Sequence, residues 1–175
     1  MIITLAFVNG FQEKVADKIF GFWGHIRVQK YETGKSLISE ELPLTKNTAV
    51  ENSLATTPGV VSYQSFATKS AVLESNTEIE GVLIKGIEKN ENHTALKKFL
   101  VAGKWIQFED SLYSKETIVS DAVAKQLQIK LNDTIKVHFV ATNADAQKTY
   151  RKLVVVGFYH TGIDEYDKLF MIADI

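Results

Sequence analysis

The chain has 175 residues, of which 45% are hydrophobic and 23% are charged, so it can form a buried core and is not disordered as a whole. Its 20 Lys and Arg residues nearly balance its 21 Asp and Glu residues, and a formal net charge of −1 gives no sign of a nucleic-acid partner or an anionic membrane surface. The sequence contains no cysteine, which excludes disulfides, thiol catalysis and cysteine-ligated zinc.

Both ends of the chain are apolar. Residues 1–8 contain one threonine and otherwise only apolar residues. This run is too short for a membrane helix, which needs about 20 apolar residues, and it lacks the basic leader of a signal peptide. It fits either a buried strand or the outer end of a membrane helix whose beginning lies outside the chain. Residues 169–175 form a strand-like run without a polar tail, so we expect a chain that is truncated at its C-terminus.

The first predicted element after this run is an amphipathic helix over residues 10–20. Asn9 is its expected N-cap and Gly21 its expected stop, because these residue types favour helix ends. Polar side chains occupy the opposite face. Its apolar stripe consists of Phe11, Val15 and Ile19.

The rest of the chain predicts an α+β fold that is rich in strands and has short helices. Alternating or continuous apolar residues predict strands over 25–31, 60–65, 66–74, 80–87, 117–119, 135–139 and 153–159, with a last strand at the C-terminus. Helices are expected over 48–56, 94–101 and 121–127. Residues 141–148 and 160–167 are expected to be loops, and the turn at residues 132–133 places Asn132 in a left-handed conformation.

The residues alone give a weak case for an enzyme. The phosphate-binding glycine motifs, the G-x-S-x-G elbow and the H-E-x-x-H zinc motif are all absent. Of the four histidines, His160 is followed by a group of carboxylates, Asp164, Glu165 and Asp167. His160 with Asp164 forms the centre of one hypothesis, a small hydrolase or metal enzyme. A turn rich in acidic residues is the commoner explanation of such a loop.

Four stretches together resemble a known family. They are VNGFQEK…KIFGFWGHI (8–26), GVLIKGI (81–87), IVSDAVAKQL with KLND (118–133) and VVGFYHTGIDEYD (155–167). Their order and spacing are similar to the extracytoplasmic domain of LolC/LolE-type lipoprotein-releasing ABC transporter permeases, which have a MacB-like periplasmic core and belong to the FtsX-like permeases. Asn132 stands where the family usually has glycine. The family-motif residues expected to matter for structure are Gly10, Gly21, Gly86, Gly157, Gly162, Glu165, Tyr166 and Asp167.

The resemblance implies a Porter-like split β-α-β unit with a strand-rich Sabre-like insert. In that arrangement residues 1–8 are the outer end of the first transmembrane helix, and residues 9–24 are an amphipathic stalk helix and turn. Residues 25–77 are the first half of the Porter-like part and residues 78–149 are the insert. Residues 150–175 begin the second half, which is incomplete.

The resemblance also implies a function without a catalytic, cofactor or metal site in this chain. The domain would lie in the periplasm, anchored to the bacterial inner membrane, and couple ATP hydrolysis by a separate cytoplasmic subunit to the release of lipoprotein or lipid-like cargo. A second permease subunit and a periplasmic lipoprotein chaperone are implied partners, and nucleic acid is not. The short loop at 141–148 argues against direct contact with the chaperone. An efflux or cell-division permease with the same core is the alternative within transport.

Overall fold

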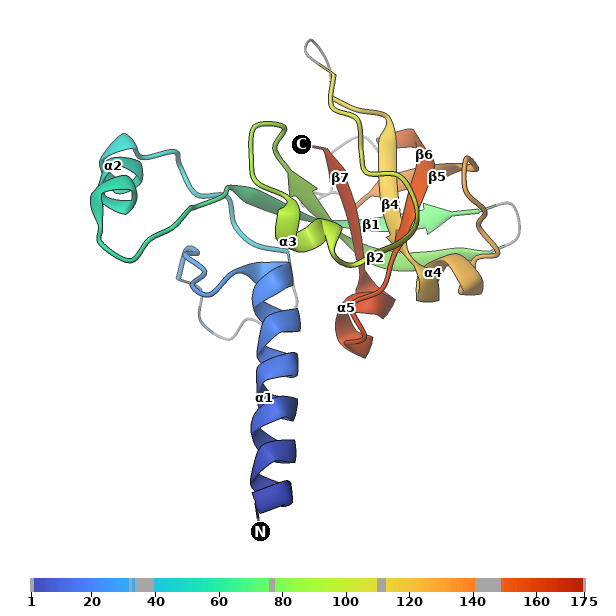
Figure 1. Ribbon diagram of the computed structural model, residues 1–175. Coiled ribbons are helices and arrows are strands. Elements are labelled where there is room, and N and C mark those ends of the chain that lie inside the picture. The colour runs from blue at the N-terminus through green and yellow to red at the C-terminus, as the bar shows by residue number, and fades with distance from the viewer. Residues whose placement is uncertain are drawn as a thin grey trace.

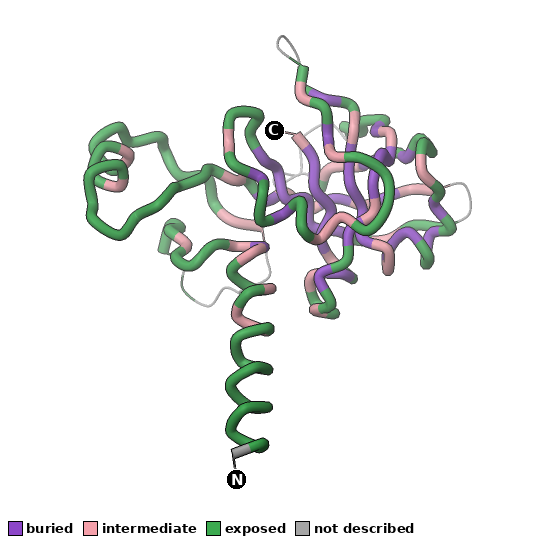
Figure 2. Tube along the Cα trace, viewed as in Figure 1, coloured by how far each residue is buried: buried purple, intermediate pink, exposed green. Residues whose placement is uncertain are grey.

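The computed structural model describes residues 2–31, 33, 40–75, 78–109, 113–140 and 149–174. A long helix projects from a body built around a β-sheet, and a segment with one short helix extends from another side (Figure 1). The body holds the buried residues, whereas the projecting helix is exposed over most of its length (Figure 2). The described elements are α1 (Ile2–Trp23), α2 (Thr48–Thr56), β1 (Phe66–Glu74), β2 (Ile79–Ile87), α3 (Thr94–Lys97), β3 (Leu100–Gly103), β4 (Glu116–Ser120), α4 (Asp121–Gln126), β5 (Thr134–Phe139), β6 (Tyr150–Tyr159), α5 (Asp164–Leu169) and β7 (Phe170–Asp174).

The described strands form one sheet that closes on itself. The order is β3-β6-β4-β7-β2-β1-β5, and β5 also pairs with β6. The β6 strand is long enough to do this because residues 150–154 pair with β5 while residues 157–159 pair with β3. The β2–β7 and β4–β6 pairs are parallel and the others are antiparallel. Closure removes most free sheet edges, which otherwise attract foreign strands.

The inside of this closed sheet is one hydrophobic core. Alternate residues of the strands point inward, as the period of two requires. Helix α4 adds Val123 and Ala124, and the residue after it adds Leu127. Helix α4 begins at a capped residue, because the Ser120 hydroxyl oxygen accepts a hydrogen bond from the Val123 N–H at 3.0 Å. The strand residues of this core are Ala71, Leu73, Val82, Ile84, Val119, Ile135, Val137, Leu153, Val155, Met171 and Ala173.

A second core covers the outer face of the sheet. It combines the opposite faces of β2, β4, β6 and β7 with the last turn of α1, with α3 and with the segment after β3. Residues such as Leu83, Ile118 and Ile172 alternate along their strands with residues of the inner core. These strands are covered on both faces, which explains their continuous apolar sequences. The second core joins α1 to the body.

Most predicted elements are confirmed. The structure contains the predicted helix at 48–56 and the predicted strand at 66–74. The strands and the helix predicted between residues 117 and 139, and the strands predicted at 153–159 and at the C-terminus, lie within a few residues of their expected bounds. Asn132 has a φ of 70°, as expected from the turn at that position. The α+β class is therefore confirmed. The division into Porter-like and Sabre-like parts stays a prediction, and strands from all three predicted segments pair in the one sheet.

Several local predictions are wrong. Residues 25–31 and 60–65 alternate like strands but pair with no strand of the described chain. The helix expected over 94–101 ends at Lys97 and gives way to β3, and the loop expected over 160–167 contains the start of α5. Helix α1 neither starts after Asn9 nor stops at Gly21.

The structure buries most residues of the apolar runs at 153–159 and 169–172. Most of the exposed large apolar side chains of the described residues lie on α1 and between residues 26 and 63. The loop predicted at 141–148 lies outside the described residues. Among the described residues, none of the helices combines the length and the apolar character that a membrane crossing requires.

Gly157 provides a test of the sheet packing. A Cβ atom at this position would lie 2.7 Å from the Lys104 carbonyl oxygen and 2.9 Å from a methyl group of Leu100. We expect Gly157→Ala to lower the free energy of unfolding by about 1–3 kcal/mol, because backbone cannot yield as a flexible side chain does. Gly81→Ala in β2 is the matched control, since nothing lies within 4 Å of its Cβ position. Chemical denaturation measures the free energy of unfolding of both variants. Equal values for Gly157→Ala and Gly81→Ala would contradict the packing at Gly157.

Candidate functional site

The last turn of α1 is inserted into the outer core of the body. Phe22 is 2% exposed. Its ring stacks on Tyr166 of α5 at a centroid distance of 5.0 Å and meets the edge of Phe170 in β7 at 5.5 Å. Tyr159 of β6 lies 6.1 Å away. A single side chain of α1 therefore contacts three separate elements of the body.

Trp23 extends this contact to the first strand. Its ring lies edge-on to Phe66 of β1 at 5.4 Å and to Phe170 at 5.2 Å. Burial of Phe22 contributes about 1.5–3 kcal/mol, and each favourable ring pair of Phe22 or Trp23 about 0.5–1.5 kcal/mol more. We call the residues that receive Phe22 and Trp23 the aromatic socket. They are Phe66, Lys85, Tyr159, Tyr166 and Phe170.

Lys85 is the charged member of the socket. It lies in β2, is 5% exposed, and its Nζ donates a hydrogen bond to the Phe22 carbonyl oxygen at 2.7 Å. The same nitrogen lies 4.1 Å from the centroid of the Trp23 ring and 4.9 Å from those of Phe22 and Phe66. The lysine thus binds the end of α1 through one carbonyl and through ring faces that attract cations.

The surroundings of Lys85 lower its pKa from 10.5 to about 7. Burial is the main cause, because it disfavours the charged form, and the nearby positive charge of Arg27 adds to it. Arg27 itself lies 4.9 Å over the Trp23 ring and forms an ion pair with Glu41 at 3.3 Å. Within the described parts of the chain, no carboxylate forms an ion pair with Lys85.

Two glycines complete the attachment of α1. Gly21 faces Phe99, whose ring would lie 3.0 Å from a Cβ atom at that position, so the absence of a side chain permits close packing. Gly24 follows the helix with a φ of 85°, a left-handed value that glycine adopts without strain, and its N–H bonds to the Phe20 carbonyl at 2.8 Å. The stop of the helix is therefore Gly24, three residues later than the sequence predicts.

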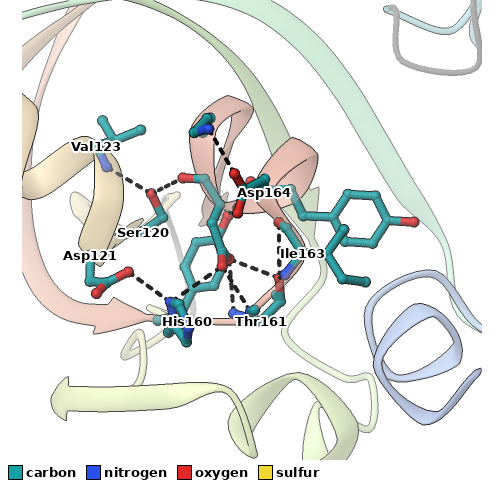
Figure 3. A network of polar contacts seen from close by, with 12 residues as sticks. Ser120, Asp121, Val123, His160, Thr161, Ile163 and Asp164 are labelled. Carbon is teal, nitrogen blue, oxygen red and sulfur yellow. Dashed lines mark hydrogen bonds and ion pairs between the residues drawn. The ribbon is translucent and has the colours of Figure 1, made fainter. Parts of the chain in front are cut away.

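The segment before α5 is held by the buried carboxylate of Asp167. Its Oδ1 accepts hydrogen bonds from the Thr161 N–H and hydroxyl, both at 2.8 Å, and its Oδ2 accepts one from the Gly162 N–H at 2.8 Å. Gly162 has a φ of 73°. The Ser120 hydroxyl donates to the Asp167 carbonyl oxygen, which joins the N-cap of α4 to α5 (Figure 3). This network fixes α5, and with it Tyr166 in the socket.

The structure does not bring His160 and Asp164 together as a catalytic pair. His160 Nδ1 lies 3.0 Å from Asp121 and 3.3 Å from Asp167, whereas Asp164 pairs with Lys168 at 2.8 Å (Figure 3). Lys168 also holds the pKa of the exposed Asp164 carboxyl below its usual range, the opposite of what a general acid needs. Among the described residues, no group of three or more His, Asp or Glu side chains is placed to hold a metal ion.

The other residues singled out from the sequence are not members of the socket. Gly10 is exposed on α1 with nothing near its Cβ position, and Gly86 lies in β2 between Ala67 and Ala173. Glu165 is exposed at the start of α5. On the predicted stripe, Phe11 is 62% exposed, Ile19 is 37% exposed and Val15 is half-buried.

Sequence reasoning missed the residues that join α1 to the body. Phe22 and Trp23 follow the predicted stop of the helix, and Lys85 occurs inside a quoted motif whose glycine alone was singled out. One signal was present: residues 82–87 are buried without exception, and Lys85 is the only charged residue among them. A lysine in such a run indicates a special partner, since lysine is almost never fully buried otherwise.

Comparisons with known proteins agree with the resemblance. Residues 1–172 match the family described as the MacB-like periplasmic core domain. The chain is 30% identical over 142 residues to the lipoprotein-releasing system transmembrane protein LolC of Buchnera aphidicola subsp. Schizaphis graminum, covering 77% of this chain and 31% of that protein. It is 22% identical over 151 residues to LolE of Haemophilus influenzae, covering 84% and 34%. The chain thus spans about a third of the length of these curated relatives.

Among solved structures, the chain is similar to the extracellular domain of the ABC-type transporter YknZ from Gram-positive bacteria. The TM-score is 0.47 at 17% sequence identity, and the match covers 70% of this chain and 59% of that chain.

The Asp167 network yields a test by substitution. Asp167→Ala leaves the Thr161 and Gly162 N–H groups without the carboxylate that accepts from them, so we expect a loss of about 2–4 kcal/mol in the free energy of unfolding. Asp164→Ala removes a carboxylate that is 83% exposed and pairs with Lys168. It should change stability by less than about 1 kcal/mol. Thermal or chemical unfolding compares the two, and a larger loss for Asp164→Ala would refute the role given to Asp167.

Lys85 yields a test by pH. Its pKa is about 7 in the folded chain and 10.5 in the unfolded chain. Between these values the unfolded state binds more protons, so stability rises with pH, by at most about 1.4 kcal/mol per pH unit. We expect this rise between pH 7 and about 9 in denaturation curves of the wild type.

Lys85→Met should abolish the rise, and Lys130→Met, which removes an exposed lysine, should preserve it. If the free energy of unfolding rises equally with pH in the wild type and in both variants, the pKa of Lys85 is not lowered by the fold.

Proposed function

The chain belongs to the MacB-like periplasmic core domain family, and we propose that it is the extracytoplasmic part of an ABC transporter permease at the bacterial inner membrane. In this function a separate cytoplasmic subunit hydrolyses ATP. The domain described here converts the resulting movement of the membrane helices into release or export of lipoprotein or lipid-like cargo. The names of the relatives LolC and LolE support lipoprotein as the cargo.

The observation that carries the proposal is the attachment of α1. A single continuous helix runs from Ile2 to Trp23 and reaches the body only with its last turns (Figure 1). A rigid helix that is fixed at one end by Phe22 and Trp23 transmits rotation or displacement of its other end to the body. Because the socket joins β1, β2, β6, β7 and α5, a movement of α1 acts on the closed sheet as a whole.

The outer turns of α1 have the composition expected of the end that lies near the membrane. Its first turns carry exposed apolar side chains, with Ile3 84% exposed and Phe7 72% exposed, and its charged residues begin at Glu13. In the proposed function residues 1–8 are the outer end of the first transmembrane helix, where lipid covers these side chains. Residues 9–24 then form the stalk between the membrane and the body.

The partners follow from this arrangement. The cytoplasmic ATPase subunit acts through membrane segments of the complete permease. A second permease subunit or another membrane-proximal helix of the complex covers the stripe of Phe11, Val15 and Ile19, which the body leaves largely exposed. In the proposed domain division, residues 25–77 and 150–175 belong to the Porter-like part and residues 78–149 to the Sabre-like insert. Contact with a periplasmic chaperone would involve the loop at 141–148, which lies outside the described residues.

A charge on the stripe tests the proposal in the complete permease. We expect Phe11→Asp, Val15→Asp and Ile19→Asp each to reduce release of lipoproteins from the inner membrane, because a buried unpaired carboxylate costs several kcal/mol. Gln12→Asp places the same charge on the same helix beside the stripe and is the control.

The assay measures the share of lipoprotein that remains in the inner membrane, with the amount of permease checked in each strain. Wild-type release in all three stripe variants would rule out a packed stalk.

A further inference from the structure

The position of Lys85 poses a physical question. A lysine at 5% exposure loses most of its hydration, and no carboxylate of the described residues forms an ion pair with it, although the charges of Glu41 and Glu91 favour its charged form from a greater distance. An apolar residue of similar length would fill the same space without that cost. The net stability of the fold therefore does not explain why a lysine occupies this position, and its specific contacts have to explain it.

The contact that an apolar residue cannot replace is the hydrogen bond to Phe22. The last four carbonyl groups of a helix have no partner within the helix, and the Phe22 carbonyl is one of these in α1. It lies at a buried residue, where a polar group without a partner is costly. Lys85, which is 63 positions away in the sequence, donates a hydrogen bond from its Nζ to this carbonyl oxygen at 2.7 Å.

The element that carries Lys85 is well suited to hold a helix in one direction. In β2, Lys85 pairs with Thr68 of β1 on one side and with Ile172 of β7 on the other, so its backbone lies inside the sheet. The aromatic contacts of Phe22 and Trp23 hold the helix end against the sheet, but apolar burial is not directional. A hydrogen bond to one particular carbonyl is directional.

We propose that Lys85 is a positioning residue, which fixes the direction of α1 relative to the sheet by donating to the Phe22 carbonyl. This inference rests on the proposed function, in which α1 transmits movement, and deepens it by naming the residue that sets the starting angle of this helix. Without Lys85 the four aromatic residues of the socket still bind α1, but the helix adopts a range of directions.

The distance between two spin labels measures this direction. The chain contains no cysteine, so Lys14→Cys on α1 and Lys152→Cys on β6, both exposed, provide two unique labelling sites. Pulsed electron resonance then gives the distribution of distances between them in the 175-residue chain. The distribution is compared among the otherwise wild-type chain, Lys85→Met, Lys85→Arg and the control Lys130→Met.

We expect a narrow distribution in the reference chain, in Lys130→Met and in Lys85→Arg, because arginine keeps a donor and stacks on aromatic rings. In Lys85→Met the distribution should become at least about twofold wider, since the Phe22 carbonyl in the last turn of α1 loses its donor and the turn frays. A narrow distribution in Lys85→Met overturns the inference, and so does an equally wide one in Lys85→Arg. If Lys85→Met does not fold, Lys85→Gln replaces it, because the shorter amide does not reach the carbonyl.

This result is independent of the test of function. The label distances report on α1 in the chain alone, whereas the stripe variants report on lipoprotein release by the permease. A wide distribution in Lys85→Met together with silent stripe variants would refute the proposed function and retain Lys85 as the residue that directs α1. The reverse result would retain the function and refute the role of Lys85.

Discussion

The insertion of Phe22 and Trp23 into the aromatic socket is the contact on which the relation between α1 and the body depends. Most of α1 is exposed, and its last turns hold it to the sheet. The socket in turn depends on α5, whose Tyr166 stacks on Phe22. Helix α5 is held by the buried carboxylate of Asp167 and by the Ser120 hydroxyl at the start of α4. The inner core, the Asp167 network and the socket therefore form one continuous support for the helix.

The sequence predicted those parts of the fold in which local pattern and long-range pairing agree. The strands β1, β2, β5 and β6 follow their hydrophobic periodicity. The start of α4 was predictable because Ser120, its N-cap, is a residue type that favours this position. Residues 25–31 show the limit of this reasoning, because an alternating pattern becomes a strand only where another strand pairs with it. The short α3 and α5 contain four and six residues, too few for a helical period to be recognised.

The candidate site was predictable in part for the same reason. Gly162, Tyr166 and Asp167 stood out because a family motif includes them, and the structure gives Tyr166 and Asp167 specific contacts. The hypothesis of a His160–Asp164 centre relied on proximity in sequence, which does not determine the partner of a side chain in space. Lys85 and Phe22 are 63 residues apart, and the lysine meets the end of α1 because β2 lies between β1 and β7, whose Phe66 and Phe170 contact Trp23. Contacts of this kind depend on tertiary structure and leave little trace in a single sequence.

The central claim is that the base of α1 belongs to the folded body while the rest of the helix does not. Native-state hydrogen exchange of the backbone amides measures this directly. If the aromatic socket holds α1, the Gly24 amide, which bonds to the Phe20 carbonyl, exchanges as slowly as amides of β2 and β7, and amides between residues 5 and 14 exchange much faster. If the Gly24 amide exchanges as fast as those of the outer turns while β2 and β7 remain protected, α1 is not anchored and the account is wrong.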